Sequence, residues 1–254
     1  MTPGIKPLVC GNWKMNGHQA DKAKLSEINH GYSPDLEAVV DLAICPSFTL
    51  IAGFAAGSAK VALGAQDCHV AESGAHTGDV SAAMLVDAGA RFVIVGHSER
   101  RSDHGEGDAL IRQKTEAVVA AGATPIVCVG ETQNERESGN AISVVEGQVA
   151  ASLPDDVPAD LVIAYEPVWA IGTGLVPSAQ DVAEMHAAMR AALTDRFGTL
   201  GDGFRLLYGG SVKPGNATEL MAVANVDGAL VGGASLKPDD FLGIAKAYLE
   251  ISGS

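Results

Sequence analysis

One local pattern recurs along this chain: a short apolar run, then a polar or glycine-containing turn, then a stretch whose apolar residues repeat every three or four positions. The eight apolar runs begin near Leu8, Val40, Val61, Phe92, Thr124, Leu161, Arg205 and Gly228. They are continuous rather than alternating, which is typical of strands buried on both faces. Because each gap is long enough for a crossover helix, we expect neighbouring strands to pair in parallel.

The stretches between these runs have the periodicity of amphipathic helices. In the clearest example, one helix face consists of Val182, Met185, Met189, Leu193 and Phe197. Ser178 precedes this stretch and is the expected N-cap, because its hydroxyl can accept a hydrogen bond from an N–H of the first turn. A second apolar stripe ends at Pro154, whose ring stops a helix. The chain is therefore predicted to alternate strands and helices.

The number of units and the chain length together predict the architecture. Eight βα units in 254 residues fit a closed (β/α)8 barrel, an α/β fold in which helices ring eight parallel strands. No change of composition and no low-complexity linker divides the sequence, so we expect residues 1–254 to form one domain. A doubly wound open sheet is the alternative that the same alternation leaves open.

Composition argues against several classes of function. The chain has 47% hydrophobic and 19% charged residues, which is typical of an ordered globular protein. Its 17 Lys and Arg against 31 Asp and Glu give a net charge of −14, without any basic cluster, so we expect no nucleic-acid partner. The most apolar stretch, 161–176, is interrupted by Glu166, Pro167 and two glycines, so we expect no membrane span.

Cysteine usage and the first residues indicate the compartment. Cys10, Cys45, Cys68 and Cys128 are widely spaced and form no CxxC pair, which favours reduced core thiols over disulfides or a zinc site. The N-terminal residues carry no apolar run of the length that an export signal needs. We therefore expect a cytoplasmic protein without a metal site.

A barrel of this kind carries its chemistry at the carboxyl ends of the strands and in the loops that follow them. Polar residues and glycines concentrate at those positions of this sequence: Asn12, Lys14, Gln66, His97, Glu99, Glu131, Glu166, Gly209 to Ser211, Gly232 and Gly233. These residues are the candidates for a functional site.

Glycine pairs follow the seventh and eighth expected strands. Gly209-Gly210 precedes Ser211, and Gly232-Gly233 follows the last strand. Backbone N–H groups at such turns can converge on an anion near the start of a helix. Glycines also relieve crowding in tight turns, and one pair alone does not distinguish the two interpretations. Two pairs after strands seven and eight match the phosphate position of barrels, so we expect phosphate binding there.

Glu166 and His97 are candidates for proton transfer. Glu166 ends an apolar run, where desolvation of the carboxylate would raise its pKa toward the range of a general base. His97 precedes a short helical turn, whose positive end favours a neutral imidazole that donates a hydrogen bond. Taken alone, each residue is explained at least as well by a structural role. Glu166 could be a strand-end carboxylate paired with a cation, and His97 could be a buried histidine with its hydrogen bonds satisfied.

Lys14 and Asn12 are two positions apart and so share one face of an extended segment. Lys14 is the only cation at the end of the first expected strand. A cation directed into a barrel mouth needs an anion, and Glu99 is the expected protein partner. The convergence of these groups with Glu166 on one mouth favours a catalytic site over separate structural roles.

Five segments carry a resemblance to a known family. They are GNWKMN at 11–16, GHSERR at 96–101, AYEPVWAIGTG at 164–174, YGGSV at 208–212 and LVGGA at 230–234. In content and in order they resemble the triosephosphate isomerase family, from the first expected strand to the last. The segment 166–174 is highly specific to that family.

The resemblance implies an enzyme that interconverts dihydroxyacetone phosphate and glyceraldehyde 3-phosphate through an enediolate, with no metal and no cofactor. By similarity, Glu166 moves the carbon-bound proton, and neutral His97 polarises the carbonyl. Lys14 offsets negative charge and is fixed by Glu99, while Asn12 holds substrate oxygens. The phosphate would be held by the N–H groups of Gly172, Ser211, Gly232 and Gly233.

Residues 167–177 resemble the closing lid of the family. Pro167 begins a rigid hinge, and the small residues that follow can approach the phosphate closely. Closure would exclude water and hinder loss of phosphate from the intermediate. The far hinge departs from the commoner small-residue form, because Pro177 fixes a backbone angle.

The loop from Gln66 to Ser81 resembles the arm that the family projects into a second subunit. Long ordered loops are uncommon in compact domains, and burial against a partner subunit would account for this one. We therefore expect a homodimer, with Thr77 near the partner subunit's Asn12 or Lys14. His76 stands where the family often carries an aromatic residue, which leaves the stability of the dimer in acid open.

Two alternatives remain open at the level of sequence. One is another phosphate-binding barrel, such as a ribulose-phosphate epimerase or an indole-glycerol-phosphate synthase. An epimerase would need His and Asp ligands at strand ends, and His97 is the one strand-end histidine. The other is a barrel that binds without catalysis, against which the presence of Asn12, Lys14, His97 and Glu166 argues.

Overall fold

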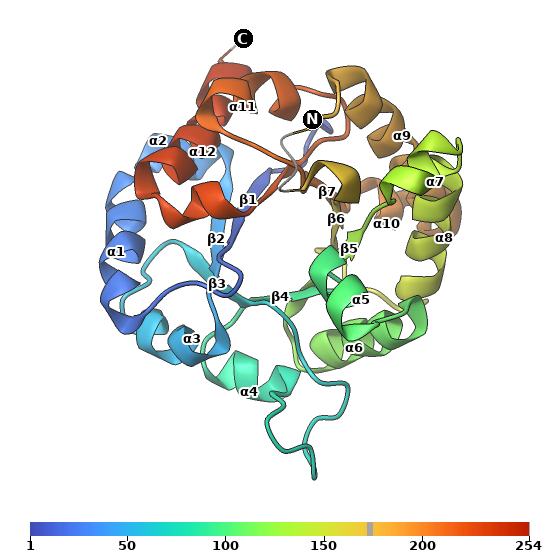
Figure 1. Cartoon of the computed structure of the whole chain (residues 1–254). Coiled ribbons are helices and arrows are strands. Elements are labelled where there is room, and N and C mark those ends of the chain that lie inside the picture. Colours follow the sequence, from blue (N-terminus) through green and yellow to red (C-terminus); the bar gives the residue numbers. More distant parts are fainter. Residues whose placement is uncertain (172–174, 254) are drawn as a thin grey trace.

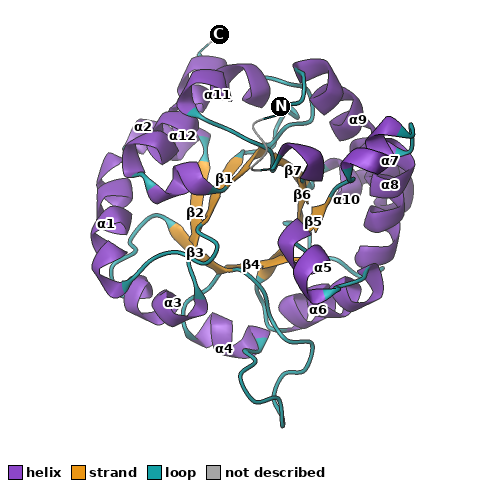
Figure 2. Ribbon diagram, viewed as in Figure 1, coloured by secondary structure: helices purple, strands orange, loops and turns teal. Residues whose placement is uncertain are grey.

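Eight parallel strands close into a barrel in a computed structural model that describes residues 1–171 and 175–253. Figure 1 looks into the barrel, and Figure 2 separates the inner ring of strands from the outer ring of helices by colour. Strand β1 pairs with β2 on one side and with β8 on the other, where Leu8 lies opposite Gly228. The predicted (β/α)8 barrel is confirmed, and the open doubly wound sheet is wrong.

The strands begin within one residue of the expected positions. Their bounds are β1 Leu8–Asn12, β2 Asp41–Cys45, β3 Ala62–Ala65, β4 Phe92–Val95, β5 Thr124–Val129, β6 Val162–Tyr165, β7 Arg205–Tyr208 and β8 Gly228–Val231. Nearly every strand residue is buried. The runs read as continuously apolar because one strand face packs inside the barrel and the other packs against helices.

Helices follow the strands, several of them in two pieces. The α-helices are α1 Lys22–Gly31, α2 Pro34–Val39, α3 Phe48–Ala55, α4 Ala82–Asp87, α5 Ser98–His104, α6 Asp108–Ala120, α7 Gln133–Glu137, α8 Ala141–Ser152, α9 Ala179–Phe197, α10 Thr199–Asp202, α11 Pro214–Met221 and α12 Pro238–Ser252. Short 3-10 helices are η1 Gln19–Asp21, η2 Val168–Ala170 and η3 Gly233–Leu236. Ser178 caps α9 as expected. No described helix combines the length and apolar character that crossing a membrane takes.

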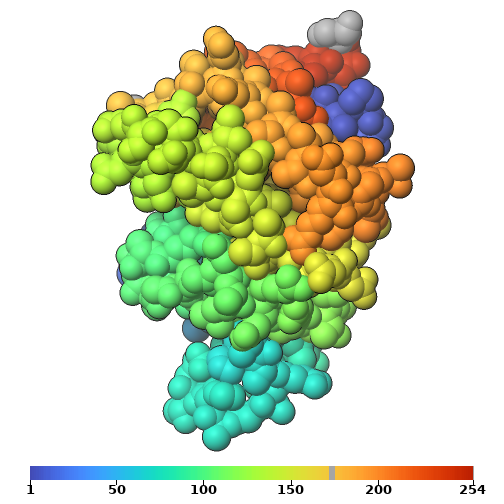
Figure 3. Space-filling model, turned by 90° about the vertical axis from the view of Figure 1, so that its right-hand side faces the viewer, coloured from blue at the N-terminus to red at the C-terminus, as the bar shows by residue number. Residues whose placement is uncertain are grey.

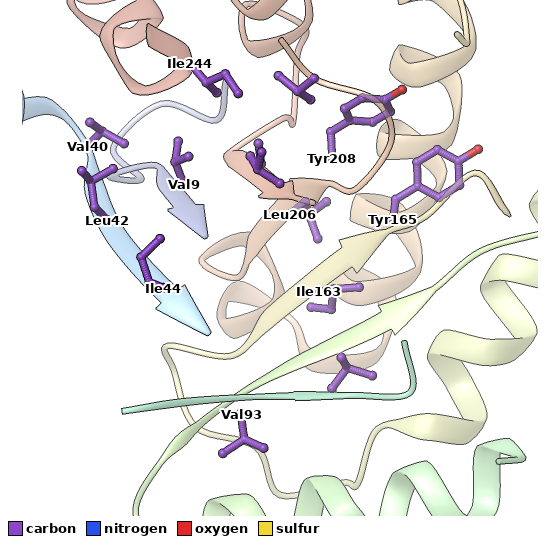
Figure 4. Packing of buried hydrophobic residues seen from close by; sticks show 14 of the residues in the cluster. Val9, Val40, Leu42, Ile44, Val93, Ile163, Tyr165, Leu206, Tyr208 and Ile244 are labelled. Carbon is purple, nitrogen blue, oxygen red and sulfur yellow. The ribbon is translucent and has the colours of Figure 1, made fainter. Parts of the chain in front are cut away.

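Side chains of each strand alternate between two apolar layers. Outward-facing residues such as Val9, Leu42 and Ile44 belong to the layer between strands and helices, which Figure 4 shows together with Ile244 of α12. The inner layer fills the barrel and consists of Leu8, Cys10, Ala43, Cys45, Phe92, Ile94, Ile126, Cys128, Val162, Ala164, Leu207 and Leu230. The four cysteines are buried free thiols, as expected.

The loop between β3 and α4 is the largest excursion from the barrel. It extends away from the helices in Figure 1 and forms the lower projection in Figure 3. Its two ends are joined by the N–H of His69, which donates to the carbonyl of Val80, and by a bridge between His69 and Ser81. Residues 72–79 are exposed.

Candidate active site

The carboxyl ends of the strands surround a cavity of about 360 Å³. It is lined by most of the predicted site residues: Asn12, Lys14, His97, Glu166, Ser211, Gly232 and Gly233. The remaining one, Gly172, lies outside the described residues. Residues far apart in the sequence meet here because parallel strands of a barrel all end at the same rim.

Glu166 directly follows β6 and is 2% exposed. Its Oε1 atom lies 2.8 Å from Nε2 of His97, and its Oε2 atom accepts a hydrogen bond of 2.8 Å from the N–H of Ser98. The chain after β5 approaches it closely, since a Cβ at Gly130 would lie 1.7 Å from the carbonyl oxygen of Glu166. The absence of a side chain at Gly130 therefore leaves room for the backbone of Glu166.

His97 is the N-cap of α5 and is 5% exposed. Its Nδ1 atom accepts a hydrogen bond of 3.2 Å from the N–H of Glu99. A ring nitrogen that accepts a hydrogen bond carries no proton, so the neutral ring holds its proton on Nε2. Nε2 faces the cavity and Glu166. His97 lies at the start of a helical turn, as the sequence predicts.

The pKa directions of this pair differ from the sequence-based expectation. Burial raises the pKa of Glu166, but the His97 ring and the N–H of Ser98 stabilise the carboxylate more strongly, and the pKa is lowered overall. Burial lowers the pKa of His97, but the neighbouring Glu166 charge outweighs it, and that pKa is raised. The expected upward shift of the Glu166 pKa and the expected preference of His97 for the neutral ring are therefore both wrong, because each residue faces a partner from another strand end.

Lys14 has a backbone φ of 52°, a left-handed value that residues other than glycine rarely adopt. The side chain of Asn12 accepts the N–H of Lys14 at 3.0 Å, and that of Gln66 donates to its carbonyl at 2.9 Å. The ammonium lies 2.7 Å from Oε1 of Glu99, which confirms the predicted ion pair. These contacts hold a strained backbone so that the cation lies at the cavity.

The last glycine pair forms an open backbone surface. Gly232 is the N-cap of η3, and a Cβ built on Gly233 would meet nothing within 4 Å. Within the described part of the chain, the N–H groups of Ser211, Gly232 and Gly233 donate no hydrogen bond to another residue. Unpaired N–H groups at the start of a helical turn suit an anion.

The earlier glycine pair is closely surrounded by other atoms. A Cβ on Gly209 would lie 3.0 Å from Cγ of Glu166, and a Cβ on Gly210 would lie 2.2 Å from the hydroxyl of Tyr208. Helix α11 begins only at Pro214, after a further loop. These glycines therefore relieve crowding, and they line the cavity together with Ser211.

Comparison with known proteins shows the family. The family model described as triosephosphate isomerase matches residues 7–248. This chain belongs to the triosephosphate isomerase family. The triosephosphate isomerase of Bradyrhizobium diazoefficiens is 59% identical over 249 residues, which are 97% of this chain and 99% of the relative. That of Rhizobium meliloti is 57% identical over 255 residues, 99% of this chain and 100% of the relative.

A solved structure agrees with these relatives. The crystal structure of triosephosphate isomerase from Bartonella henselae has a TM-score of 0.90 to this chain at 45% sequence identity. The match covers 96% of this chain and 100% of that one. The family that the five sequence segments indicated is confirmed.

The cavity of this family member also contains residues to which the sequence assigned no role. They include Lys213, which is the N-cap of α11, and Leu230, an inward-facing residue of β8 that is 4% exposed. Lys213 could have been found as a cation shortly after the YGGSV segment. Leu230 could have been found from the alternation of faces along its strand. Lys213 lies near the predicted phosphate position, and Leu230 gives the cavity part of an apolar wall.

Glu131, a candidate by position, does not line the cavity. Its Oε1 atom accepts hydrogen bonds from the hydroxyl of Tyr165 at 3.0 Å and from Nε1 of Trp169 at 2.8 Å. Its backbone carbonyl accepts the N–H of Val168 at 3.2 Å. This fully buried carboxylate therefore holds the chain that follows β6.

A candidate metal cluster lies away from the active site. Among residues 1–171 and 175–253, the group able to hold a metal is His69, His76 and Asp79, whose ligand atoms lie within 4.8 Å of one another. Nδ1 of His69 accepts the N–H of Ala71 at 3.0 Å, so the neutral ring has its proton on the nitrogen facing Asp79. The cluster does not provide the strand-end ligands that an epimerase would need.

Proposed function

We propose that this member of the triosephosphate isomerase family interconverts dihydroxyacetone phosphate and D-glyceraldehyde 3-phosphate, a step of glycolysis and gluconeogenesis. One observation carries the proposal: a single cavity holds the carboxylate of Glu166, the ring N–H of His97 and the ammonium of Lys14 beside backbone N–H groups that donate to none of the described residues. The reaction moves protons between neighbouring atoms and leaves the phosphate intact. It needs a base, an electrophile and an anion site, and the proposed mechanism uses no metal or cofactor.

Substrate binding begins with an exchange at His97. In the free site, Nε2 of His97 contacts Glu166. The substrate carbonyl takes over this N–H, and the carboxylate moves to the adjacent C–H. The move removes the contact that lowers the Glu166 pKa, while burial, which raises it, remains. Glu166 thus becomes a stronger base once the substrate is bound.

Proton transfer then proceeds in two steps. Glu166 accepts the proton from the carbon next to the carbonyl, and the C–H electron pair forms the enediolate, with negative charge on the former carbonyl oxygen. His97 stabilises that oxygen and relays the hydroxyl proton, Lys14 offsets the charge, and Asn12 holds the oxygens. Glu166 then returns its proton to the neighbouring carbon. Fixed charges and dipoles in a buried site stabilise such an intermediate more than water does.

The phosphate end of the substrate lies at Ser211, Gly232 and Gly233 in this proposal. Their N–H groups donate to the dianion, and Lys14 is near, because a Cβ on Gly232 would lie 3.7 Å from Cε of Lys14. A chain with a net charge of −14 binds this anion because affinity depends on the groups around the cavity. Residues 167–177 are proposed to close over the phosphate and exclude water.

The homodimer is proposed through the loop Gln66 to Ser81. Residues 72–79 of this loop are exposed, and Met15, next to Lys14, is 97% exposed. A second subunit would cover both surfaces and place Thr77 near the partner subunit's Asn12 or Lys14. Sedimentation equilibrium is expected to give twice the chain mass, and a monomer at micromolar concentration would contradict the dimer. A cytoplasmic location is proposed from the reduced thiols.

Glu166→Gln tests the proposed function. Gln has nearly the same shape but cannot accept the proton, so kcat/KM is expected to fall by roughly 10³-fold in a coupled dehydrogenase assay. The variant is expected to fold and still bind 2-phosphoglycolate, a substrate analogue. Activity within tenfold of wild type would overturn the assignment of the base. Tight binding by a wild-type chain that shows no turnover would favour the binding-only alternative.

A further inference from the structure

Arg136 lies between the two ends of the segment 167–178, which borders the cavity. It belongs to α7, and its Cζ atom lies 4.8 Å from the ring centroid of Trp169. Its Nη2 atom lies 2.6 Å from Oδ1 of Asp181. Trp169 is in η2 at the start of the segment, and Asp181 is in the first turn of α9 just beyond its end. The guanidinium of Arg136 therefore contacts residues at both ends of the segment.

At the first end, Glu131 reinforces the contact. Nε1 of Trp169 donates to Oε1 of Glu131 at 2.8 Å, and Nη1 of Arg136 lies 3.5 Å from the same oxygen. Glu131 is fully buried, and a buried carboxylate is costly unless hydrogen bonds and a counter-charge compensate it. Arg136 supplies that counter-charge while it stacks on the indole.

At the second end, Asp181 uses both carboxylate oxygens. Oδ1 pairs with Arg136, while Oδ2 accepts from the N–H of Ser178 at 3.0 Å and from its hydroxyl at 2.7 Å. Ser178 is the N-cap of α9 and directly follows Pro177. The start of α9 and the end of the segment are therefore joined to Arg136 through one side chain.

We propose that Arg136 is a positioning residue of the isomerisation, which fixes the two ends of segment 167–178 relative to each other through Trp169 and Asp181. The inference rests on the proposed function, in which residues 167–177 of this segment close over the phosphate. A planar guanidinium suits the role, because one face can stack on an aromatic ring while its edge binds a carboxylate. A lysine keeps the positive charge but has neither the planar group nor the paired N–H donors of arginine.

Arg136→Met, which keeps an apolar stem and loses both contacts, is the main test. We expect its kcat/KM for glyceraldehyde 3-phosphate to fall about tenfold. We also expect the inorganic phosphate released per isomerised triose to rise. A poorly positioned segment would let the enediolate break its C–O bond to phosphate, with the electron pair leaving on the phosphate oxygen. Arg136→Lys is expected to recover part of the loss.

Two further measurements separate positioning from a general loss of structure. Trp13, the other tryptophan of the chain, is 1% exposed, so acrylamide quenching of fluorescence reports mainly on Trp169 and is expected to increase in Arg136→Met. Asp181→Asn removes the same link from its other side. Residues that act through one link have non-additive effects, so Arg136→Met/Asp181→Asn is expected to lose no more activity than Arg136→Met alone. If the losses of activity in the two single variants multiply in the double variant, the proposed link is wrong.

Arg112→Met is the matched control. Arg112 pairs with Asp155 at 3.3 Å on the outer surface, and its loss is expected to leave kcat/KM within twofold. If Arg136→Met also stays within twofold with unchanged phosphate release, the inference is wrong while the proposed function stands. Absence of isomerase activity in the wild-type chain would instead overturn the proposed function. If Arg136→Met does not fold, Arg136→Lys and Asp181→Asn decide by the same criteria.

Discussion

The Nε2 atom of His97 lies 2.8 Å from the Oε1 atom of Glu166, so the proposed electrophile and the proposed base bind each other in the free site. Their side chains are 6% and 3% exposed, and water therefore weakens the contact little. A substrate carbonyl that requires the same N–H has to break this contact. The pair thus links substrate binding to the basicity of Glu166.

Binding of 2-phosphoglycolate is expected to take up about one proton near pH 7. In the free site, the contact with His97 lowers the Glu166 pKa, so the carboxylate is ionised. The ligand separates the pair and places its own carboxylate nearby, and both changes raise that pKa. Isothermal titration calorimetry in buffers of different ionisation enthalpy measures the uptake. Affinity is expected to fall as pH rises through the pKa of the complex.

Glu166→Gln is the control for this proton uptake. The variant has no carboxyl group at this position to titrate, so its binding enthalpy is expected to depend much less on the buffer. A wild-type binding enthalpy that is the same in all buffers would show that separation from His97 does not change the protonation of Glu166. The proposed rise in basicity would then be wrong.

Gly233→Ala is expected to weaken substrate binding without unfolding the barrel. A Cβ at this position meets nothing within 4 Å, and Gly233 lines the cavity, so the methyl group lies where the phosphate is proposed to approach. We expect KM to rise about tenfold with little change in the unfolding temperature. Gly215→Ala, on the exposed side of α11, also meets nothing and is the control. Equal KM values for the two variants would place the phosphate elsewhere.

The ring of strands could be predicted from local pattern because each strand is buried on both faces. Runs such as Phe92–Val95 are continuously apolar, and their boundaries in the structure coincide with those in the sequence. The ion pair of Lys14 with Glu99 could be predicted because both residues follow strands and so reach the same rim. The burial pattern of the strands and the rule that parallel barrel strands end at one rim were sufficient to predict these features.

Features that depend on which groups pack together in detail at the strand ends could not be predicted. The lowered pKa of Glu166 depends on His97, which comes from a different strand end. The role of Glu131 depends on the indole and the phenol that β6 and its following turn place against it. The need for glycine at position 209 depends on the proximity of Glu166. In each case the deciding group is distant in sequence.

Arg190→Met is expected to destabilise the fold by about 3 kcal/mol, measured by urea unfolding. Nη2 of Arg190 lies 2.8 Å from Oδ2 of Asp227, which is fully buried and also accepts the N–H groups of Thr2 and Leu206. Removing the guanidinium leaves a buried charge without its counter-charge. Lys24→Met breaks a partly exposed pair with Asp21 and is expected to cost less than about 1 kcal/mol.

The effect of Arg190→Met on catalysis is expected to be small. Asp227 accepts from Leu206 near the start of β7, whereas the cavity lies at the carboxyl ends of the strands. The folded variant is therefore expected to keep kcat/KM within about twofold of wild type. A large loss of activity in the folded state would show that the two ends of the barrel are coupled.

Lys14→Met is expected to lower kcat/KM by about 10²- to 10³-fold, because it removes the charge that offsets the enediolate and the phosphate. Glu99→Gln leaves that charge in place and loses only the 2.7 Å contact that holds it, so its loss is expected to be about tenfold or less. Lys6→Met, at the amino end of β1, removes an exposed pair with Asp41 and is the control. Steady-state kinetics at several salt concentrations distinguish a field effect from a fixed contact. A Lys14→Met variant that kept a tenth of the activity would contradict the proposed role of the ammonium. The strained backbone of Lys14 would then have to be explained by something other than the placement of this charge.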